Sequence, residues 1–311
     1  MSHPSPPSLS TVLSPASSFP FKSDFDVLKV NALEELPSIW TLEFDHGKAN
    51  EVGSQVLKEL DLLVNHLNQP NGPVALISFS QRKSKKGTPI FISGANVVER
   101  VGWSDEDVKA HVRRQRALLS RLRHAPVFHV CVVNGVTLGW GTEFLITADY
   151  KLSVETARFG LPETGLGILP GAGGSSELAN LIGPAHTLRL GMTGEQISAE
   201  EALRIDLIQE KYEDLDQALQ RAYTLCQLTT KKSPTALAAF KQAMLNSLGE
   251  SSAIRMENEA VAYEVCVDAG QAAIGRRDFT LIRQGQTPQW GPRQPNPFSS
   301  LSNASTEKGE E

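Results

Sequence analysis

The sequence predicts an α/β core followed by a helical region, and two patterns support this prediction. In the first half of the chain, short apolar runs such as residues 74–77 alternate with segments of helical periodicity. Such runs are typical of strands covered by helices on both faces. Beyond about residue 175 the pattern is helical almost throughout. The 311 residues, 40% hydrophobic and 21% charged, suit one large globular domain or two ordinary ones.

The first half supplies most of the predicted sheet. Strands are expected at residues 39–44, 74–77, 127–133 and 150–154. Between the first two strands, apolar side chains recur at steps of three and four, which indicates a helix: Val56, Leu60, Leu63 and Leu67. A second helix is expected over residues 105–123. Strand–helix–strand order with short connections indicates a parallel sheet.

The second half is predicted to be helical, with one strand-like interruption at residues 207–212. The helical segments are 176–182, 184–191, 198–205, 214–229, 233–248 and 252–270. Both ends of the chain are rich in Ser and Pro and have little apolar periodicity, which is typical of disorder. We therefore divide the chain into a disordered tail over 1–23, an α/β core over 24–200, a helical region over 201–284 and a second disordered tail over 285–311.

Composition excludes several classes of protein. The formal charge of −5 and a pI near 5.9 give no electrostatic reason to bind nucleic acid. No apolar run approaches the roughly 18 residues of a membrane span. The widely spaced Cys131, Cys226 and Cys266 form no disulfide framework, so we expect a cytoplasmic protein. The motifs GxxxxGK[ST], GxSxG and HExxH are absent, and the scattered histidines do not favour a metal site.

Two glycine-rich stretches lie where a ligand could approach the backbone. The stretch FISGAN spans residues 91–96, and NGVTLGWGTE spans residues 134–143, after a buried strand and at the start of a helix. Small residues at such a turn allow close approach of a ligand, and the free N–H groups of a helix's first turn favour negative charge. The alternative is that these glycines serve only tight turns and close packing.

Two glutamates lie near the second stretch. Glu143 is in the first turn of the predicted helix, and Glu163 follows the strand at 150–154. If helix and strand return past the same turn, both carboxyl groups meet in one pocket, where one can act as base and one as acid. The alternative is that Glu143 only complements the helix dipole and Glu163 lies on a solvated loop.

These motifs together resemble the enoyl-CoA hydratase/isomerase (crotonase) superfamily over nearly all of residues 25–280. The segment PVFHVCVVNGVTLGWGTEFLITADYKLSVETARFGLPETGLGILPGAGG resembles the family's central signature. The segment MTGEQISAEEALRIDLIQE resembles the helix pair that follows, and ISGAN resembles the first oxyanion-hole loop. The resemblance implies a crotonase-like spiral of ββα units with a helical C-terminal trimerisation region.

The resemblance also implies the chemistry. It predicts an acyl-CoA substrate, no metal or redox cofactor, and a homotrimer or homohexamer, and from the composition we expect binding to neither nucleic acid nor membranes. By motif position, the backbone N–H groups of Ala95 and Trp140 form an oxyanion hole, and Glu143 and Glu163 match the two acids of the hydratases. The loop lining the thioester continues through Asn96, Val97 and Val98. These matches imply a lyase that adds water to a trans-2-enoyl-CoA, or the reverse dehydration.

The sequence departs from the family pattern at three positions of this site. Trp140 stands in the middle of what is usually Gly-Gly-Gly, so its indole either narrows the acyl pocket or points into the core, which we favour. Asn96 replaces a usual Asp, and Val98 stands where a basic residue often helps to bind CoA. These differences leave open an enoyl-CoA isomerase or another acyl-CoA reaction such as hydrolysis or decarboxylation. A non-catalytic CoA-binding protein is a further alternative.

Overall fold

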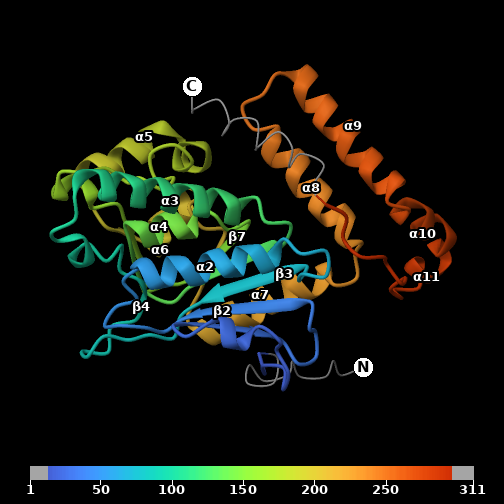
Figure 1. Cartoon of the computed structure of the whole chain (residues 1–311), viewed down its shortest axis with the longest axis horizontal. Helices are drawn as coiled ribbons and strands as arrows, with labels where there is room; N and C mark the ends of the chain where they lie inside the picture. The colour runs from blue at the N-terminus through green and yellow to red at the C-terminus, as the bar shows by residue number, and fades with distance from the viewer. Residues whose placement is uncertain (1–12, 296–311) are drawn as a thin grey trace.

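The structure is a computed structural model that describes residues 13–295. Residues 1–12 and 296–311, the outer parts of the two predicted tails, lie outside the described residues. The main sheet has six strands in the order β1-β2-β3-β5-β7-β10 (Figure 1). Their bounds are Leu28–Ala32, Ile39–Phe44, Ala75–Phe79, Phe128–Val133, Tyr150–Val154 and Glu210–Tyr212. Only β1 pairs antiparallel, and the other neighbours are parallel, as predicted.

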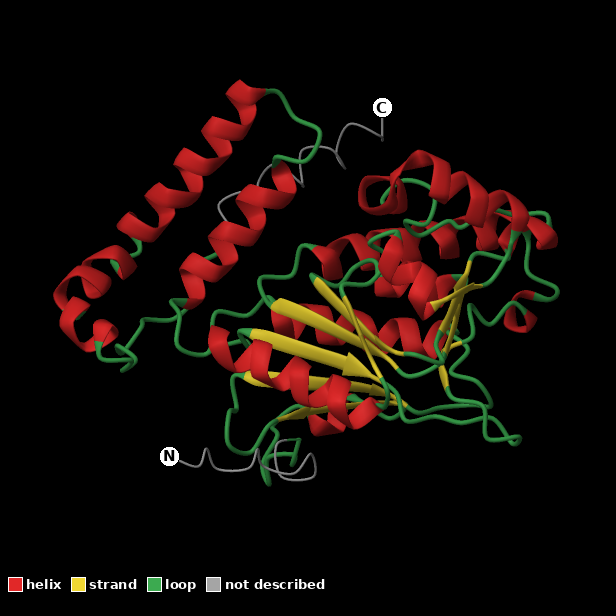
Figure 2. Ribbon diagram, turned by 180° about the vertical axis from the view of Figure 1, so that it is seen from behind, coloured by secondary structure: helices red, strands yellow, loops and turns green. Residues whose placement is uncertain are grey.

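A smaller sheet stands beside the first (Figure 2). Its strands, in the order β4-β6-β8-β9, are Ile90–Ile92, Val136–Leu138, Arg158–Gly160 and Ile197–Ser198. Each of β3, β5 and β7 in the main sheet is followed by a strand of the small sheet and then by a helical segment. This alternation is the predicted spiral of ββα units. The small-sheet strands escaped prediction because two or three residues are too few to show a periodicity.

Helices cover both faces of the main sheet. The helices around the two sheets are α2 (Ser54–Leu67), α3 (Asp105–Arg123), α4 (Trp140–Leu145), α5 (Leu178–Thr193), α6 (Ala199–Arg204) and α7 (Leu215–Thr229). Leu76 of β3 packs in the core that includes α2 and α3, whereas its neighbour Ile77 packs in the core that includes α7. Successive side chains of one strand therefore both face apolar cores, which explains the continuous apolar run.

The predicted boundary between core and helical region lies too early. Strand β10 joins the main sheet, and α7 buries Leu219 and Ala222 against it, so the α/β core extends to about residue 229 rather than 200. The remaining helices are α8 (Pro234–Asn246), α9 (Ser252–Asp268), α10 (Gln271–Arg277) and α11 (Phe279–Arg283). Helices α8 and α9 lie side by side at one end of the molecule, and α9 is the farther of the two from the sheets (Figures 1 and 2).

The prediction of disordered tails is wrong for residues 13–23 and 285–295. Phe19 is buried in the core and packs edge-on against Trp40, with ring centroids 5.0 Å apart. Arg293 is buried, and its guanidinium donates to four backbone carbonyls: those of Leu67, Gln69, Pro73 and Pro126. Composition averages over a segment, so it misses a single side chain that anchors the segment to the core. No helix within 13–295 is long and apolar enough to cross a membrane.

Candidate active site

The first predicted ligand loop follows β4 and lies against the segment before α2. Val52 N donates to Gly94 O at 2.9 Å, and Asn96 N donates to Val52 O at 2.8 Å. Ala95, between these two bonds, has an N–H that donates no hydrogen bond within residues 13–295. These bonds hold the free N–H in place, because the carbonyl of its own peptide group and the amide of the next peptide group are both bonded to Val52.

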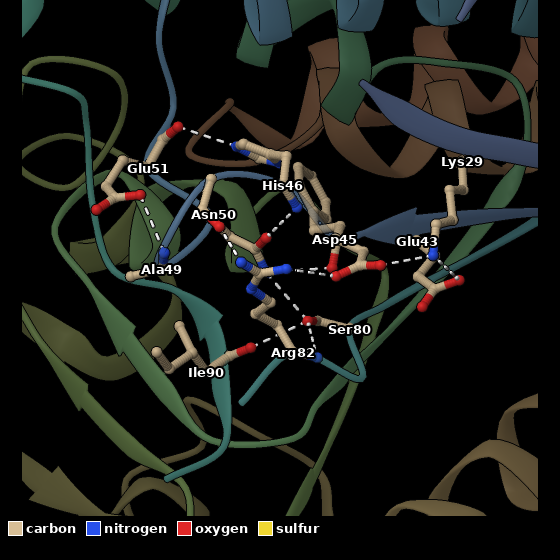
Figure 3. Close-up of polar contacts among 12 residues, drawn as sticks. Lys29, Glu43, Asp45, His46, Ala49, Asn50, Glu51, Ser80, Arg82 and Ile90 are labelled. Carbon is tan, nitrogen blue, oxygen red and sulfur yellow. Dashed lines mark hydrogen bonds and ion pairs between the residues drawn. The ribbon is translucent and has the colours of Figure 1, made fainter. Parts of the chain in front are cut away.

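Asn50 positions that supporting segment (Figure 3). It is fully buried with a φ of 54°, a conformation that Asn tolerates better than most residues. Its side-chain nitrogen donates to Phe44 O, Ser80 Oγ and Phe91 O at 3.1, 3.0 and 2.7 Å. Its side-chain oxygen accepts from His46 N at 2.8 Å. Asn50 thereby ties the segment to β2, to β4 and to Ser80, the residue after β3. Sequence reasoning missed it, because one Asn in a polar turn carries no pattern.

Figure 3 also shows a second brace around this turn. Arg82 donates to an Asp45 carboxylate oxygen at 3.0 Å and also contacts the Gly47 carbonyl. Lys29 binds the other carboxylate oxygen of Asp45 at 2.6 Å. The turn between β2 and α2 is therefore held from both sides, which keeps the loop around Ala95 in one position.

The second predicted loop leads from β6 into α4. Gly139 has a φ of 53°, which suits glycine, and Trp140 begins the helix. The Trp140 N–H likewise donates no hydrogen bond within the described chain. A Cβ on Gly141 would lie 2.4 Å from the carbonyl oxygen of Ile92, so the helix start presses directly on β4. This contact brings the Trp140 amide to the loop that carries Ala95.

The Trp140 indole points into the core, as favoured from the sequence. The residue is 2% exposed, belongs to the main core cluster and stacks on Phe144 with ring centroids 5.8 Å apart. The replacement of a usual glycine by Trp therefore leaves the backbone N–H free while the side chain turns away. The ring fills core volume.

Glu143 lies one turn further along α4 and is 3% exposed. Its Oε1 accepts from Ala172 N at 2.7 Å and from Gly174 N at 3.0 Å. Burial raises the pKa of this carboxyl, and the two backbone donors oppose that rise. A Cβ on Gly174 would lie 2.6 Å from Pro170 Cβ, which explains the glycine at this donor position. The carboxylate is thus held in one orientation by the loop after β8.

Glu163 begins the short 3₁₀ helix η3 (Glu163–Leu166). Its Oε1 would lie 2.6 Å from a Cβ on Gly139, so the carboxyl group sits over the turn that precedes Trp140. Its Oε2 is buried and has no hydrogen-bond partner among the described residues. Burial raises the pKa of Glu163 to about 7; its own backbone N–H opposes the rise, and the negative charge of Glu143 adds to it.

These groups line one cavity of about 230 Å³. Ala95, Trp140, Glu143 and Glu163 all contribute to its wall. Of the other predicted substrate-binding residues, Val97 lines the cavity, whereas Asn96 and Val98 are outside the lining. Asn96 instead accepts a hydrogen bond from Glu99 N at 3.3 Å. Two free amides and two carboxyl groups, which are far apart in the sequence, therefore meet in one cavity.

Sequence reasoning missed other parts of this wall. Arg100 and Gln115 line the cavity, and Ala172 and Gly174 hold Glu143 through their amides. The glycine-rich run at 171–174 was the available signal for the amides, because small residues allow a backbone to reach a buried carboxylate. No signal marked Arg100, since its relation to the cavity depends on how the segment after Ala95 folds.

The spiral of ββα units and the cavity together define an α/β protein of the crotonase class. The family model "Enoyl-CoA hydratase/isomerase" matches residues 85–284. The chain belongs to this family. It is 29% identical over 235 residues to a probable mitochondrial enoyl-CoA hydratase 2 of Arabidopsis thaliana, with 76% of each chain covered. It is 28% identical over 231 residues to a short-chain-enoyl-CoA hydratase of Clostridium acetobutylicum, covering 73% of this chain and 86% of that one.

Solved structures agree with the fold. The crystal structure of an enoyl-CoA hydratase from Bacillus anthracis superposes with a TM-score of 0.76 at 26% identity, covering 85% of this chain and 99% of that one. DspI of Pseudomonas aeruginosa superposes with a TM-score of 0.75 at 26% identity, covering 89% and all of that chain.

Proposed function

We propose that the protein is an enoyl-CoA hydratase-type lyase, which adds water to a trans-2-enoyl-CoA thioester or catalyses the reverse dehydration. One observation carries this proposal: the carboxyl groups of Glu143 and Glu163 line the same small cavity as the N–H groups of Ala95 and Trp140. The family and its hydratase relatives support an acyl-CoA substrate. The reaction needs no cofactor beyond the CoA that forms part of the substrate.

The two amides would act on the thioester carbonyl. As the α carbon gains electron density, negative charge develops on the carbonyl oxygen, and two preoriented N–H donors stabilise it. The loss of one such donor typically costs about 2.7–4 kcal/mol of transition-state stabilisation. The N–H groups of Ala95 and Trp140 donate to no group within residues 13–295, so they are available to the substrate oxygen.

The two carboxyl groups would handle water and proton. Water forms a bond to the β carbon while its proton leaves, and a proton is added at the α carbon, so that both atoms of the double bond become saturated. Glu163, with a pKa near 7, can give and take a proton at neutral pH, so we assign it to the α carbon. Glu143, held by two amides, would orient the attacking water and help to deprotonate it.

The test uses crotonyl-CoA and follows loss of absorbance at the conjugated thioester band. We expect hydration by the unaltered protein and a decrease in kcat of at least 100-fold in both Glu143→Gln and Glu163→Gln, because general acid–base groups contribute about 10²–10⁴-fold. Glu34→Gln, at an exposed position between β1 and β2, is the control for the loss of one negative charge.

Two outcomes would contradict the hydratase assignment. Turnover of 3-enoyl-CoA alone, insensitive to Glu143→Gln, would identify an isomerase that uses only Glu163. Binding of CoA thioesters without turnover on a broad panel of acyl-CoA compounds would identify a non-catalytic binding protein.

A further inference from the structure

Arg100 is a cation in the wall of the proposed active site, and the proposed mechanism gives it no role. It ends the short 3₁₀ helix η2 (Val98–Arg100) and lines the cavity shared by Glu143 and Glu163. Its side chain forms no ion pair or hydrogen bond within the described residues, and its Nε is buried. Arg100 is half-buried, and a substrate that covered its guanidinium without offering a partner would bury the charge at a cost, so this group is suited to a partner that arrives with the substrate.

The neighbouring acid does not satisfy Arg100. The Glu99 carboxylate accepts hydrogen bonds from the Ser54 backbone N–H, at 3.0 Å, and from the Ser54 hydroxyl. It thereby caps the start of α2. Burial lowers the pKa of Arg100 and the negative charge of Glu99 opposes this lowering, but no bond joins the two side chains. The guanidinium therefore keeps its donors for another anion.

A larger hollow of about 710 Å³ continues outward from this point. Seven residues line both spaces, among them Val97, Arg100 and Leu169. The outer lining adds the cations Lys109, Arg113 and Arg116 and contains no acidic residue. Its remaining side chains are aliphatic: Val97, Val108, Val112, Leu166, Ile168 and Leu169.

The cations of the outer hollow differ in whether a protein group already binds them. Lys109 binds Glu106 at 2.6 Å, and Arg116 donates to the Gly171 carbonyl at 2.8 Å. Arg113 is exposed to solvent. Arg100 alone among these four cations also lines the smaller inner cavity, and its Nε is buried. A bound anion would therefore gain most from Arg100, because charge-assisted bonds strengthen away from water.

We infer that the substrate's acyl chain carries a carboxylate at the end distant from the thioester and that Arg100 binds this carboxylate. A purely aliphatic chain would cover the aliphatic wall but would bury the Arg100 guanidinium without a partner. A carboxylate matches its planar fork with two parallel hydrogen bonds. This inference rests on the proposed function, which places the thioester at the amides of Ala95 and Trp140, in the cavity that Arg100 also lines.

The test measures binding first, so that it does not depend on turnover. Titration calorimetry compares glutaryl-CoA with pentanoyl-CoA and adipyl-CoA with hexanoyl-CoA, which are saturated pairs that differ in the terminal carboxylate. We expect at least one carboxylate-bearing thioester to bind about tenfold or more tightly than its neutral partner. Arg100→Gln should abolish that preference, and Arg100→Lys should retain part of it. Arg114→Gln is the matched control, because Arg114 lines a different hollow of α3.

Two results would overturn the inference. One is equal or weaker binding of both carboxylate-bearing thioesters. The other is an equal loss of affinity for all four thioesters and for free CoA in Arg100→Gln, which would assign Arg100 to the CoA phosphates. Thermal melting of each variant verifies that it is folded.

Turnover then separates this inference from the proposed function. Hydration of glutaconyl-CoA is compared with that of trans-2-pentenoyl-CoA, and the ratio of their kcat/KM values should fall about tenfold in Arg100→Gln. Failure to hydrate either compound, with the binding preference intact, would count against the lyase and leave the carboxylate site standing. Hydration of both compounds with no preference in binding would support the lyase and count against the carboxylate site.

Discussion

Single residues determine the chemistry of the cavity through their degree of burial. Glu143 and Glu163 are both carboxylic acids, yet their surroundings differ: two amides hold Glu143, whereas an oxygen of Glu163 has no partner within residues 13–295. The pKa of Glu163 therefore rises to about 7. Both acids were predicted from their positions beside two turns. Their different surroundings depend on the loop over 171–174, which no spacing in the sequence relates to α4.

The raised pKa of Glu163 predicts a pH-dependent cost in stability. The folded protein holds this proton up to about pH 7, whereas the unfolded chain releases it near pH 4.5. Between these values the folded state binds more protons, so the stabilisation by this group is complete below pH 4.5 and is lost as pH rises through 7. Glu163→Gln removes this titration. We expect the variant to gain stability relative to the unaltered protein between pH 5 and 8, on the order of 1 kcal/mol for a partly solvated group.

Denaturant unfolding at pH 5, 6, 7 and 8 measures this difference. Glu34→Gln is again the control for net charge. A constant difference between Glu163→Gln and the unaltered protein across this range would show that Glu163 titrates normally in the folded state.

At the scale of elements, the site depends on how closely α4 approaches β4. Gly141 allows the contact, because any Cβ there would lie 2.4 Å from Ile92 O and 2.9 Å from Ile92 Cβ. The loop around Ala95 follows β4 directly, and Trp140 precedes Gly141. The spacing between the two amides is therefore set by the packing of one helix start on one strand. The loop around Ala95 is bonded to Val52, which follows the Asn50 turn, and Asn50 is itself bonded to β4.

Gly141→Ala tests this dependence. The added methyl group must push α4 away from β4, so we expect destabilisation of about 1–3 kcal/mol. We also expect a decrease in kcat/KM for crotonyl-CoA of about 10²-fold, as for the loss of one oxyanion donor. Gly191→Ala in α5 is the control, since a Cβ there meets no atom within 4 Å and should leave both quantities unchanged or stabilise slightly. A Gly141→Ala protein as active as the parent would show that this contact does not set the amide spacing.

At the scale of the whole molecule, the helices after residue 233 expose a large apolar surface. Phe240 is 76% exposed, Tyr263 69% and Phe279 59%, and Met244 and Met256 are also exposed. Among the described elements, α8 and α9 pack mainly on each other, and Lys241 of α8 reaches the sheet to bind Asp149 at 2.8 Å. Apolar surface of this extent marks an interface between proteins more often than a free face.

We predict that this surface joins copies of the chain. Sedimentation at micromolar concentration should give three or six times the chain mass of 33.8 kDa, as expected for a homotrimer or homohexamer. Phe240→Glu should lower the mass toward that of one chain, because a charge would be buried in the interface. Leu188→Glu, which changes an exposed leucine on α5, is the control. A monomer at all concentrations tested would contradict the prediction.

The amino-acid sequence was enough to predict the longer elements and the residue types of the site. Periodicity located α3 over residues 105–123 and β7 over 150–154, because an amphipathic or fully apolar pattern over many residues reflects the faces that the element buries. The glycine-rich turns and the two glutamates were visible because backbone freedom and acid chemistry belong to particular residue types.

How these pieces meet depends on contacts between segments that are distant in the chain. Strand β4, the anchoring of Phe19 and Arg293, and the inclusion of α7 in the core all depend on partners more than 15 residues away in the chain. The same is true of the cavity, where an amide after β4, an amide at the start of α4 and carboxyl groups from α4 and η3 converge. A local pattern records what one segment buries, whereas a site depends on which distant segments bury it together.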